Sequence, residues 1–142
     1  MKPVEVRPVQ NRRERRIFLE FPWQIYKNDP IWVPPLLHER KKMLDPSKGS
    51  FFKHGELECA IAWRDQQPVG TICVMEDHQL NEGRALQDCV FGFFESVEDH
   101  EVAKALFDYA RAWAKEHQLN ALYGPFNLDY EDSYGILIEG RD

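Results

Sequence analysis

The sequence predicts an α+β fold with a mixed, mostly antiparallel sheet and helices on both faces of that sheet. Two strand-like runs, 57–63 and 69–77, are joined by a short polar turn, which is typical of an antiparallel hairpin. Residues 89–94 read Cys-Val-Phe-Gly-Phe-Phe, and a run that is apolar on both faces is typical of a central, doubly covered strand. An amphipathic stretch at 99–118 and a strand at 121–126 follow, and such strand–helix–strand units are nearly always right-handed parallel crossovers.

Size, composition and charge narrow the class of protein. The 142 residues fit one domain, and 43% hydrophobic residues can supply its core. The net charge of -6 argues against a general nucleic-acid-binding surface, which must be basic. One basic cluster, Arg12, Arg13, Arg15 and Arg16, is interpreted as a solvated helix face. No apolar run approaches the ~20 residues of a membrane-spanning helix. We therefore expect a cytoplasmic protein without a nucleic-acid or membrane partner.

The three cysteines, Cys59, Cys73 and Cys89, all fall inside predicted strands. Their number is odd, their spacing is wide, and they contain no C-x-x-C pair. This pattern favours buried free thiols in a reducing compartment over a disulfide framework or a zinc site. A cysteine nucleophile is the alternative, but no neighbouring motif supports it. We expect no metal site from the cysteine pattern.

The N-terminal region is predicted to form a strand and a helix. Apolar and polar residues alternate over residues 3–9, as in a half-exposed strand. Asn11 is a suitable N-cap for a helix at residues 12–27. Pro22 lies inside this helix and is expected to kink it or split it in two, because proline removes a backbone donor and clashes with the preceding turn.

A proline-punctuated connector and a short helix precede the hairpin. The aromatic and aliphatic residues of 28–35 are expected to lie over the core. Residues 36–44 are predicted to form a short helix that turns Leu37 and Met43 inward. His54 leads into the sheet and is interpreted either as a structural histidine or as a site residue.

The crossover is predicted in more detail. A polar loop is expected at residues 78–87, before the apolar strand. After that strand, Ser96-Val97-Glu98-Asp99 has the pattern of a capping box at the start of a helix. Apolar residues of this helix recur at spacings of three and four and form one stripe: Val102, Leu106, Tyr109, Ala110 and Trp113.

Several segments spread over the chain carry a resemblance to a known family. They are 21–26 (Phe-Pro-Trp-Gln-Ile-Tyr), 29–36 (Asp-Pro-Ile-Trp-Val-Pro-Pro-Leu), 51–54 (Phe-Phe-Lys-His), 91–95 (Phe-Gly-Phe-Phe-Glu), 124–127 (Gly-Pro-Phe-Asn) and 135–140 (Gly-Ile-Leu-Ile-Glu-Gly). With these segments the chain resembles the N-terminal part of an uncharacterised GNAT-like family of longer bacterial proteins. Its element order also resembles the first two-thirds of the GNAT acyltransferase fold, whose known members use acetyl-CoA. The resemblance implies that residues 1–142 form a single GNAT-like domain, either a fragment of a longer protein or a shortened relative.

The resemblance also directs attention to the turn after the apolar strand. In GNAT enzymes this loop carries an Arg/Gln-x-x-Gly-x-Gly/Ala motif whose backbone N–H groups bind the CoA pyrophosphate. Here residues 96–101 have no glycine and no arginine, and three of them are acidic. Acidic side chains stabilise a helix N-terminus but repel pyrophosphate. The sequence therefore predicts a degenerate pyrophosphate loop. Gly92 either marks a bulge beside the pantetheine arm or relieves crowding between aromatic residues.

Site residues follow from the resemblance. Tyr134 comes seven residues after Asn127, roughly the spacing of the tyrosine that protonates the leaving thiolate in GNAT enzymes, and Tyr130 competes for this role. Glu95 is interpreted either as a base that acts through water or as a plain surface carboxylate. The expected contacts to acetyl-CoA or another acyl-CoA are Phe93, Phe94, Ser96 and Asn127.

More than one function fits these observations. The first is an N-acyltransferase that transfers an acyl group from acyl-CoA to an unknown small-molecule amine. The alternative is a non-catalytic GNAT-like module whose open sheet edge is covered by a second copy or a missing C-terminal domain. A third hypothesis is a pocket for a small ligand, lined by Trp32, Phe51, Phe52 and Trp63, although aromatic residues of this kind also form ordinary cores.

Overall fold

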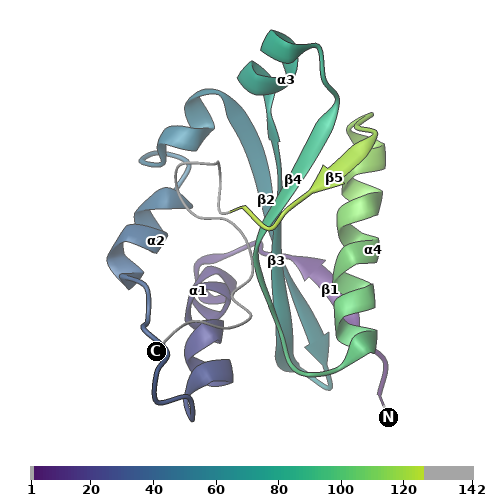
Figure 1. Ribbon diagram of the computed structural model, residues 1–142. Helices are drawn as coiled ribbons and strands as arrows, with labels where there is room; N and C mark the ends of the chain where they lie inside the picture. The colour runs from purple at the N-terminus through teal and green to yellow at the C-terminus, as the bar shows by residue number, and fades with distance from the viewer. Residues whose placement is uncertain (1, 127–142) are drawn as a thin grey trace.

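The computed structural model describes residues 2–126 and contains one five-stranded sheet with the strand order β1-β2-β3-β4-β5 (Figure 1). The strands are β1 (Glu5–Pro8), β2 (Gly55–Arg64), β3 (Gln67–Asp77), β4 (Asp88–Ser96) and β5 (Ala121–Tyr123). Pairing is antiparallel from β1 to β4 and parallel between β4 and β5. The predicted α+β class, with its mixed and mostly antiparallel sheet, is therefore confirmed.

Helices cover both faces of the sheet, as expected. They are α1 (Arg12–Tyr26), α2 (Leu37–Met43), α3 (His78–Arg84) and α4 (His100–Glu116), with a short 3-10 helix η1 (Ser50–Lys53) before β2. Figure 1 shows α4 on one side of the sheet and α1 and α2 on the other, with α3 at the end where β3 leads to β4. β4 has β3 and β5 as neighbours, so it is an interior strand.

Each face of the sheet has its own apolar core. On the α4 face, Leu106 and Val102 pack fully buried against the sheet, and burying one leucine contributes about 1.5–3 kcal/mol. On the α1 face, Phe18 packs with Met75 and Phe93. The predicted stripe of α4 is confirmed, because four of its five members are buried and the fifth, Tyr109, packs partly buried on the same core.

Local signals explain where α1 and the hairpin begin and end. The side chain of Asn11 accepts a hydrogen bond of 2.8 Å from the backbone N–H of Glu14, so the predicted N-cap is confirmed. α1 continues through Pro22, and the predicted split into two helices is wrong. The β2–β3 turn places Asp65 and Gln66 at positive φ, as a two-residue hairpin turn of the I′ type requires.

Two expectations for the crossover are wrong. Within the predicted loop 78–87, residues 78–84 form α3, whose N-terminus is capped by Asp77 through a 3.0 Å hydrogen bond to the N–H of Leu80. The N-cap of α4 is Asp99 and not Ser96. Both aspartates accept backbone N–H groups that have no partner inside the helix, and this local chemistry outweighs the polar composition of the segment.

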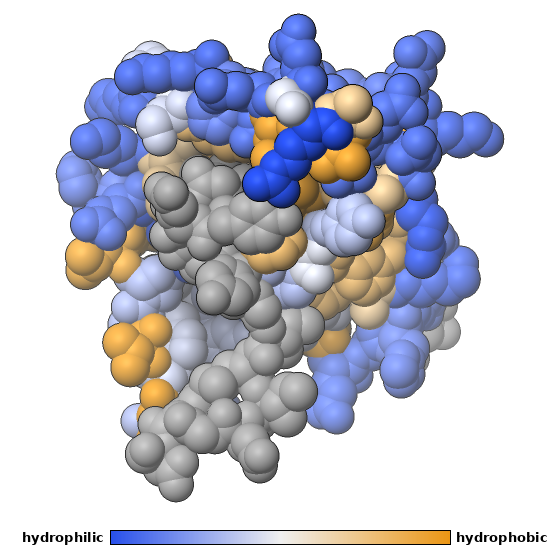
Figure 2. Space-filling model, turned by 45° about the horizontal axis from the view of Figure 1, so that its top comes forward, coloured by the Kyte–Doolittle hydropathy of each residue, from blue (hydrophilic) through white to orange (hydrophobic). Residues whose placement is uncertain are grey.

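The proline-rich connector lies closer to solvent than expected. Ile31 is 49% exposed, Val33 is 84% exposed and Leu37 is 36% exposed, so these residues do not lie over the core. Figure 2 shows the hydrophobic areas on its visible face as separate patches among hydrophilic side chains. In the described part of the chain, no helix combines the length and apolar character needed to cross a bilayer.

The cysteines lie in β2, β3 and β4, as the sequence predicts. All three are free thiols. Cys59 and Cys73 are directly opposite in the β2–β3 register, and their Sγ atoms are 3.9 Å apart. Cys73 and Cys89 are buried, and Cys59 is half-buried.

Candidate functional site

A β-bulge in β4 shapes the candidate site. Cys73 of β3 pairs with Gly92, and Thr71 pairs with Glu95, so two residues of β4 lie opposite one residue of β3. Phe93 has φ of 48°, a left-handed conformation that is uncommon for residues other than glycine. The hydroxyl of Thr71 donates a buried hydrogen bond of 2.8 Å to the carbonyl of Phe93. This bond holds the bulge in place.

The bulge reverses which face of the sheet each side chain meets. Before it, Cys89 and Phe91 belong to the core under α4. Without an extra residue, strict alternation would direct Phe93 and Glu95 to the same face. Instead, Phe93 belongs to the core under α1, and Glu95 bonds to a residue of α1. The bulge therefore brings two predicted site residues to the α1 face.

Glu95 lies in a closed environment between α1, α2 and β4. The hydroxyl of Tyr26 donates a 2.6 Å hydrogen bond to its carboxylate, and the Arg40 guanidinium lies 4.9 Å from the ring centre of Phe93. Burial raises the pKa of Glu95, whereas the Tyr26 hydrogen bond and the positive charge of Arg40 oppose this shift. The space beside these groups is about 10 Å³, the lower limit for one water molecule.

The other predicted cofactor contacts do not lie beside Phe93 and Glu95. The ring of Phe94 stacks on Phe107 of α4, with ring centres 4.9 Å apart, so it packs on the opposite face from Phe93. The hydroxyl of Ser96 donates a 2.7 Å hydrogen bond to the carbonyl of Val97. Tyr134, Asn127 and Tyr130, on which the predicted acid and one cofactor contact depend, lie outside the described residues.

β4 and β5 pair over only part of their length. The parallel register ends at Val90 opposite Tyr123, and the N–H of Phe126 then bonds to the carbonyl of Phe91 at 2.9 Å. From Gly92 to Ser96, β4 pairs with β3 alone among the described residues. The two strands therefore separate at the bulge.

The N-terminus of α4 is occupied by the protein's own carboxylate. Asp99 accepts a 2.9 Å hydrogen bond from the N–H of Glu101. Arg64, at the end of β2, donates to Asp99 at 2.9 Å and to Glu101 at 3.2 Å. The backbone bond from Glu101 and the bond from Arg64 lower the pKa of Asp99, so it is a carboxylate at neutral pH. As arranged here, the turn does not fit a pyrophosphate, because a carboxylate already takes up the N–H and the arginine.

Sequence reasoning missed the residues that complete these two environments. Tyr26 and Arg40 come from α1 and α2, and Thr71 comes from the neighbouring strand. Arg64 ends the first strand of the hairpin and lies 35 positions from Asp99. The only available signal was the predicted antiparallel pairing of β3 with β4, which places Thr71 beside the glycine-containing part of β4. Tertiary contacts of this range leave no periodicity in the sequence.

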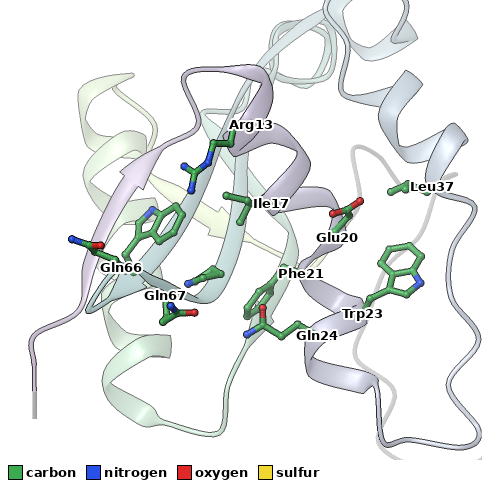
Figure 3. Close-up of a pocket in the computed structure, with 11 residues that line it drawn as sticks. Arg13, Ile17, Glu20, Phe21, Trp23, Gln24, Leu37, Gln66 and Gln67 are labelled. Atoms are coloured by element: carbon green, nitrogen blue, oxygen red, sulfur yellow. The ribbon is translucent and has the colours of Figure 1, made fainter.

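A separate open groove of about 720 Å³ lies between α1 and the β2–β3 turn. Figure 3 shows Arg13, Ile17 and Phe21 of α1 along one wall, and Gln66 of the turn and Gln67 at the start of β3 along the other. Of the aromatic residues considered for a ligand pocket, Trp63 lines this groove.

The remaining members of that proposed aromatic pocket have different neighbours. Trp32 stacks on Tyr26 at 5.2 Å, and Phe51 is buried against Phe52 at 6.5 Å. His54 contacts the ring of Phe51 and forms a 3.0 Å interaction with Asp77. The four aromatic residues are therefore distributed over different parts of the molecule.

Two curated proteins resemble nearly the whole chain. Protein YghO of Escherichia coli is 34% identical over 96% of this chain, and bacterial ceramide synthase of Caulobacter vibrioides is 33% identical over 98%. The chain spans only about a third of these relatives, 35% and 36% of their respective lengths. No protein-family model matches the sequence.

Solved structures resemble the described fold. An aminoglycoside acetyltransferase from an uncultured soil metagenomic sample gives a TM-score of 0.57 at 10% identity, covering 87% of this chain and 78% of that chain. FeeM, an N-acyl amino acid synthase from uncultured soil microbes, gives 0.55 at 15% identity, covering 86% of this chain and 70% of that chain. At such low identity these likenesses bear on the fold alone. The strand order, the parallel β4–β5 pair and these structures together show that the chain has the fold of the GNAT acyltransferases.

Proposed function

We propose that this chain is the GNAT-like part of an N-acyltransferase that moves an acyl group from a thioester donor of the acyl-CoA class to an amine. The observation that carries the proposal is the 33% identity over 98% of the chain to a protein named bacterial ceramide synthase. A ceramide is the amide of a fatty acid with a long-chain amine. We therefore propose a long-chain amine as the acceptor.

Glu95 is our candidate for the base that accepts a proton from the acceptor amine. A general base must be within hydrogen-bond reach of its substrate, directly or through one water. Glu95 is the second-to-last residue of β4 and lies on the α1 face, beyond the point where β5 leaves β4. Its raised pKa makes it a stronger base than an exposed glutamate. Since the space beside it is only about 10 Å³, this role requires Arg40 or Tyr26 to move when substrate binds.

We further propose that the α4 N-terminus is a weakened pyrophosphate site. The support is the cap formed by Asp99, together with Arg64, which is held by Asp99 and Glu101. Neutralising the two acids would release Arg64 and reduce repulsion of a phosphate. Asparagine caps helices about as well as aspartate, so Asp99→Asn should keep the helix intact while it removes the negative charge of the side chain at position 99.

The test of catalysis is direct acyl transfer. The purified chain is incubated with palmitoyl-CoA and either sphinganine or a short amine, and the amide product is measured by mass spectrometry. We expect the long-chain amide to form and Glu95→Gln to slow its formation. If the wild-type chain forms no amide with either amine at millimolar donor, the proposal fails for this chain.

The test of the weakened site is calorimetric titration with CoA. The double variant Asp99→Asn/Glu101→Gln is expected to bind CoA more tightly than wild type, by about fivefold for each removed charge near the phosphates. Glu116→Gln, at the far end of α4, serves as the matched control. Equal affinities of the double variant and the control would contradict the proposed role of the acidic turn.

The second candidate function is a non-catalytic module that binds a partner along β5. It is favoured by one observation: in the described part of the chain β5 pairs only with β4, and Tyr123 of β5 is 54% exposed. Size-exclusion chromatography with light scattering tests self-association through this edge. A concentration-independent monomer that also forms the amide would rule out the module as the main function.

A further inference from the structure

A cluster of two glutamates and two histidines lies at the open end of the β2–β3 hairpin, away from the candidate acyltransferase site. Glu56 of β2 and Glu76 of β3 are directly opposite each other in the register. Glu56 is an even number of residues from Ala60 in β2, and Glu76 is an even number from Val74 in β3. Because side chains alternate along a strand and Ala60 and Val74 face α4, both glutamates lie on the α4 face of the sheet. His78 is the first residue of α3, and His117 follows the last turn of α4. Three elements and the C-cap of α4 thus contribute one side chain each.

The ligand atoms of this cluster already lie close together. One atom each from Glu56, Glu76 and His78 lies within 4.8 Å of the others. Nδ1 of His78 is 3.2 Å from Oε2 of Glu76. Ligand atoms around a tetrahedral zinc ion are about 3.3 Å apart, given zinc–oxygen and zinc–nitrogen bonds of about 2.0–2.2 Å. Glu56 is half-exposed, at 49%, so its side chain can close the remaining distance by rotation.

The fourth residue, His117, holds Glu56 in position. Its Nδ1 is 2.9 Å from the carbonyl of Trp113, and a carbonyl only accepts, so Nδ1 carries the proton. Its ring stacks on Trp113 with ring centres 3.7 Å apart, which fixes the ring plane. Its Nε2 faces Oε1 of Glu56 at 3.2 Å, a contact that holds the carboxylate only when this second ring nitrogen is also protonated. Second-shell partners of this kind orient the carboxylates and imidazoles that bind metals.

Charge gives an independent reason for a cation at this position. Like charges directly opposite each other on two strands destabilise a sheet, and Glu56 and Glu76 form such a pair. A divalent ion between them would convert the repulsion into attraction. Imidazole and carboxylate ligands together suit zinc, whereas magnesium and calcium prefer oxygen ligands alone.

We propose that Glu56, Glu76 and His78 bind a zinc-type divalent metal ion, with His117 as a positioning residue for Glu56. The spacing of these residues in the sequence forms no metal-binding motif, because each comes from a different element. A bound ion would tie α3 to the hairpin and, through His117, to the end of α4. The proposal is independent of the acyl-transfer reaction.

The test is isothermal titration of the chelator-treated chain with zinc chloride. We expect one ion per chain with micromolar affinity. Glu56→Gln, Glu76→Gln and His78→Ala should each weaken binding by at least tenfold, whereas His38→Ala, an exposed histidine on α2, should leave it unchanged. His117→Gln should weaken binding by about 10–100-fold, as loss of an outer-shell partner does.

Cobalt absorption gives a second readout that does not depend on affinity. Cobalt(II) in a four-coordinate site with nitrogen and oxygen ligands absorbs in the visible range, and the band should disappear in His78→Ala but not in His38→Ala. Circular dichroism establishes that each variant is folded before titration. No zinc binding at millimolar metal, or binding that the His78→Ala and Glu56→Gln variants retain in full, would overturn the proposal.

Discussion

The hydroxyl of Tyr26 donates a hydrogen bond of 2.6 Å to the carboxylate of Glu95, and this bond joins the last residue of α1 to β4. Burial raises the pKa of Glu95 above its ordinary value of 4.5, and the Tyr26 bond limits the rise. Glu95 therefore keeps its proton to higher pH than an exposed glutamate does. Both the pH dependence of stability and the basicity of the candidate site follow from this pair.

Stability should fall as the pH rises through the pKa of Glu95. The pKa of Glu95 is higher in the folded state than in the unfolded state, so the folded state binds the proton more tightly. The resulting contribution to stability is fully present below the pKa of the unfolded state and is lost as the pH rises through the pKa of the folded state. We expect Glu95→Gln to flatten the dependence of the free energy of unfolding on pH between 4.5 and neutral pH. Urea unfolding at a series of pH values measures this. Parallel curves for the variant and the wild type would contradict the assignment.

Removing the Tyr26 hydroxyl should raise the pKa of Glu95 further. The hydrogen bond stabilises the charged carboxylate, so its loss in Tyr26→Phe favours the protonated form. Titration of the Glu95 carboxyl carbon by NMR measures the shift, with Tyr123→Phe on β5 as the control. If Glu95 is the proposed base, the acidic limb of the pH–rate profile should move upward with it. An unchanged titration midpoint would show that the hydrogen bond has no effect in solution.

The bulge in β4 should depend on the hydroxyl of Thr71. Thr71→Val removes the buried hydrogen bond that the hydroxyl donates to the carbonyl of Phe93, and such a hydrogen bond contributes about 0.5–1.5 kcal/mol. We expect a loss of this size in the free energy of unfolding, measured with urea. Thr71→Ser keeps the hydroxyl and should lose less. Equal losses in the two variants would mean that packing of the methyl group, and not the hydrogen bond, stabilises this position.

Two glycines should respond to alanine in opposite directions. A Cβ at Gly70 would lie 2.8 Å from Cδ1 of Leu106 and 3.0 Å from Cγ1 of Val102. Gly70→Ala should therefore overpack the contact between β3 and α4 and lower the free energy of unfolding by about 1–3 kcal/mol. A Cβ at Gly83, inside α3, meets nothing within 4 Å. Gly83→Ala should therefore stabilise the protein by up to about 1 kcal/mol. Thermal unfolding of the two variants tests the contrast, and a neutral Gly70→Ala would contradict the close approach.

The buried thiols should resist alkylation in the folded protein. Burial raises the pKa of Cys89 to about 12, and burial followed by the nearby Cys59 thiol raises the pKa of Cys73 well above its ordinary value. Since the thiolate is the reactive form, both should label slowly with iodoacetamide at mildly alkaline pH. Mass spectrometry of native and urea-unfolded samples compares the rates. Rapid labelling of Cys73 in the native protein would contradict its burial.

Sequence patterns predicted the elements of this fold because those elements are stabilised locally. The cap of Asn11, the hairpin turn and the apolar stripe of α4 depend on residues near one another in the chain, and each is present. The prediction of a loop before β4 was wrong, and the reason is again local. Asp77 caps a short helix there, and this one side chain outweighs a polar composition.

The candidate site could be predicted only in part. Glu95 was identified from its place at a strand end, but its partners Tyr26 and Arg40 come from two other elements. The direction of Phe93 could not be derived either, since an extra residue in β4 reverses the alternation on which such derivations depend. Gly92 gave an ambiguous hint of that irregularity.

That extra residue also sets how β4 can tolerate a change in length. Deleting Phe93 would restore a regular ladder in which Phe94 lies opposite Ile72 and Glu95 stays opposite Thr71, so the Glu95 carboxylate would remain on the α1 face. A deletion in the regular part of the strand, between Cys89 and Phe91, meets no extra residue that could absorb it, so it should turn the side chains on one side of the deletion to the opposite face of the sheet.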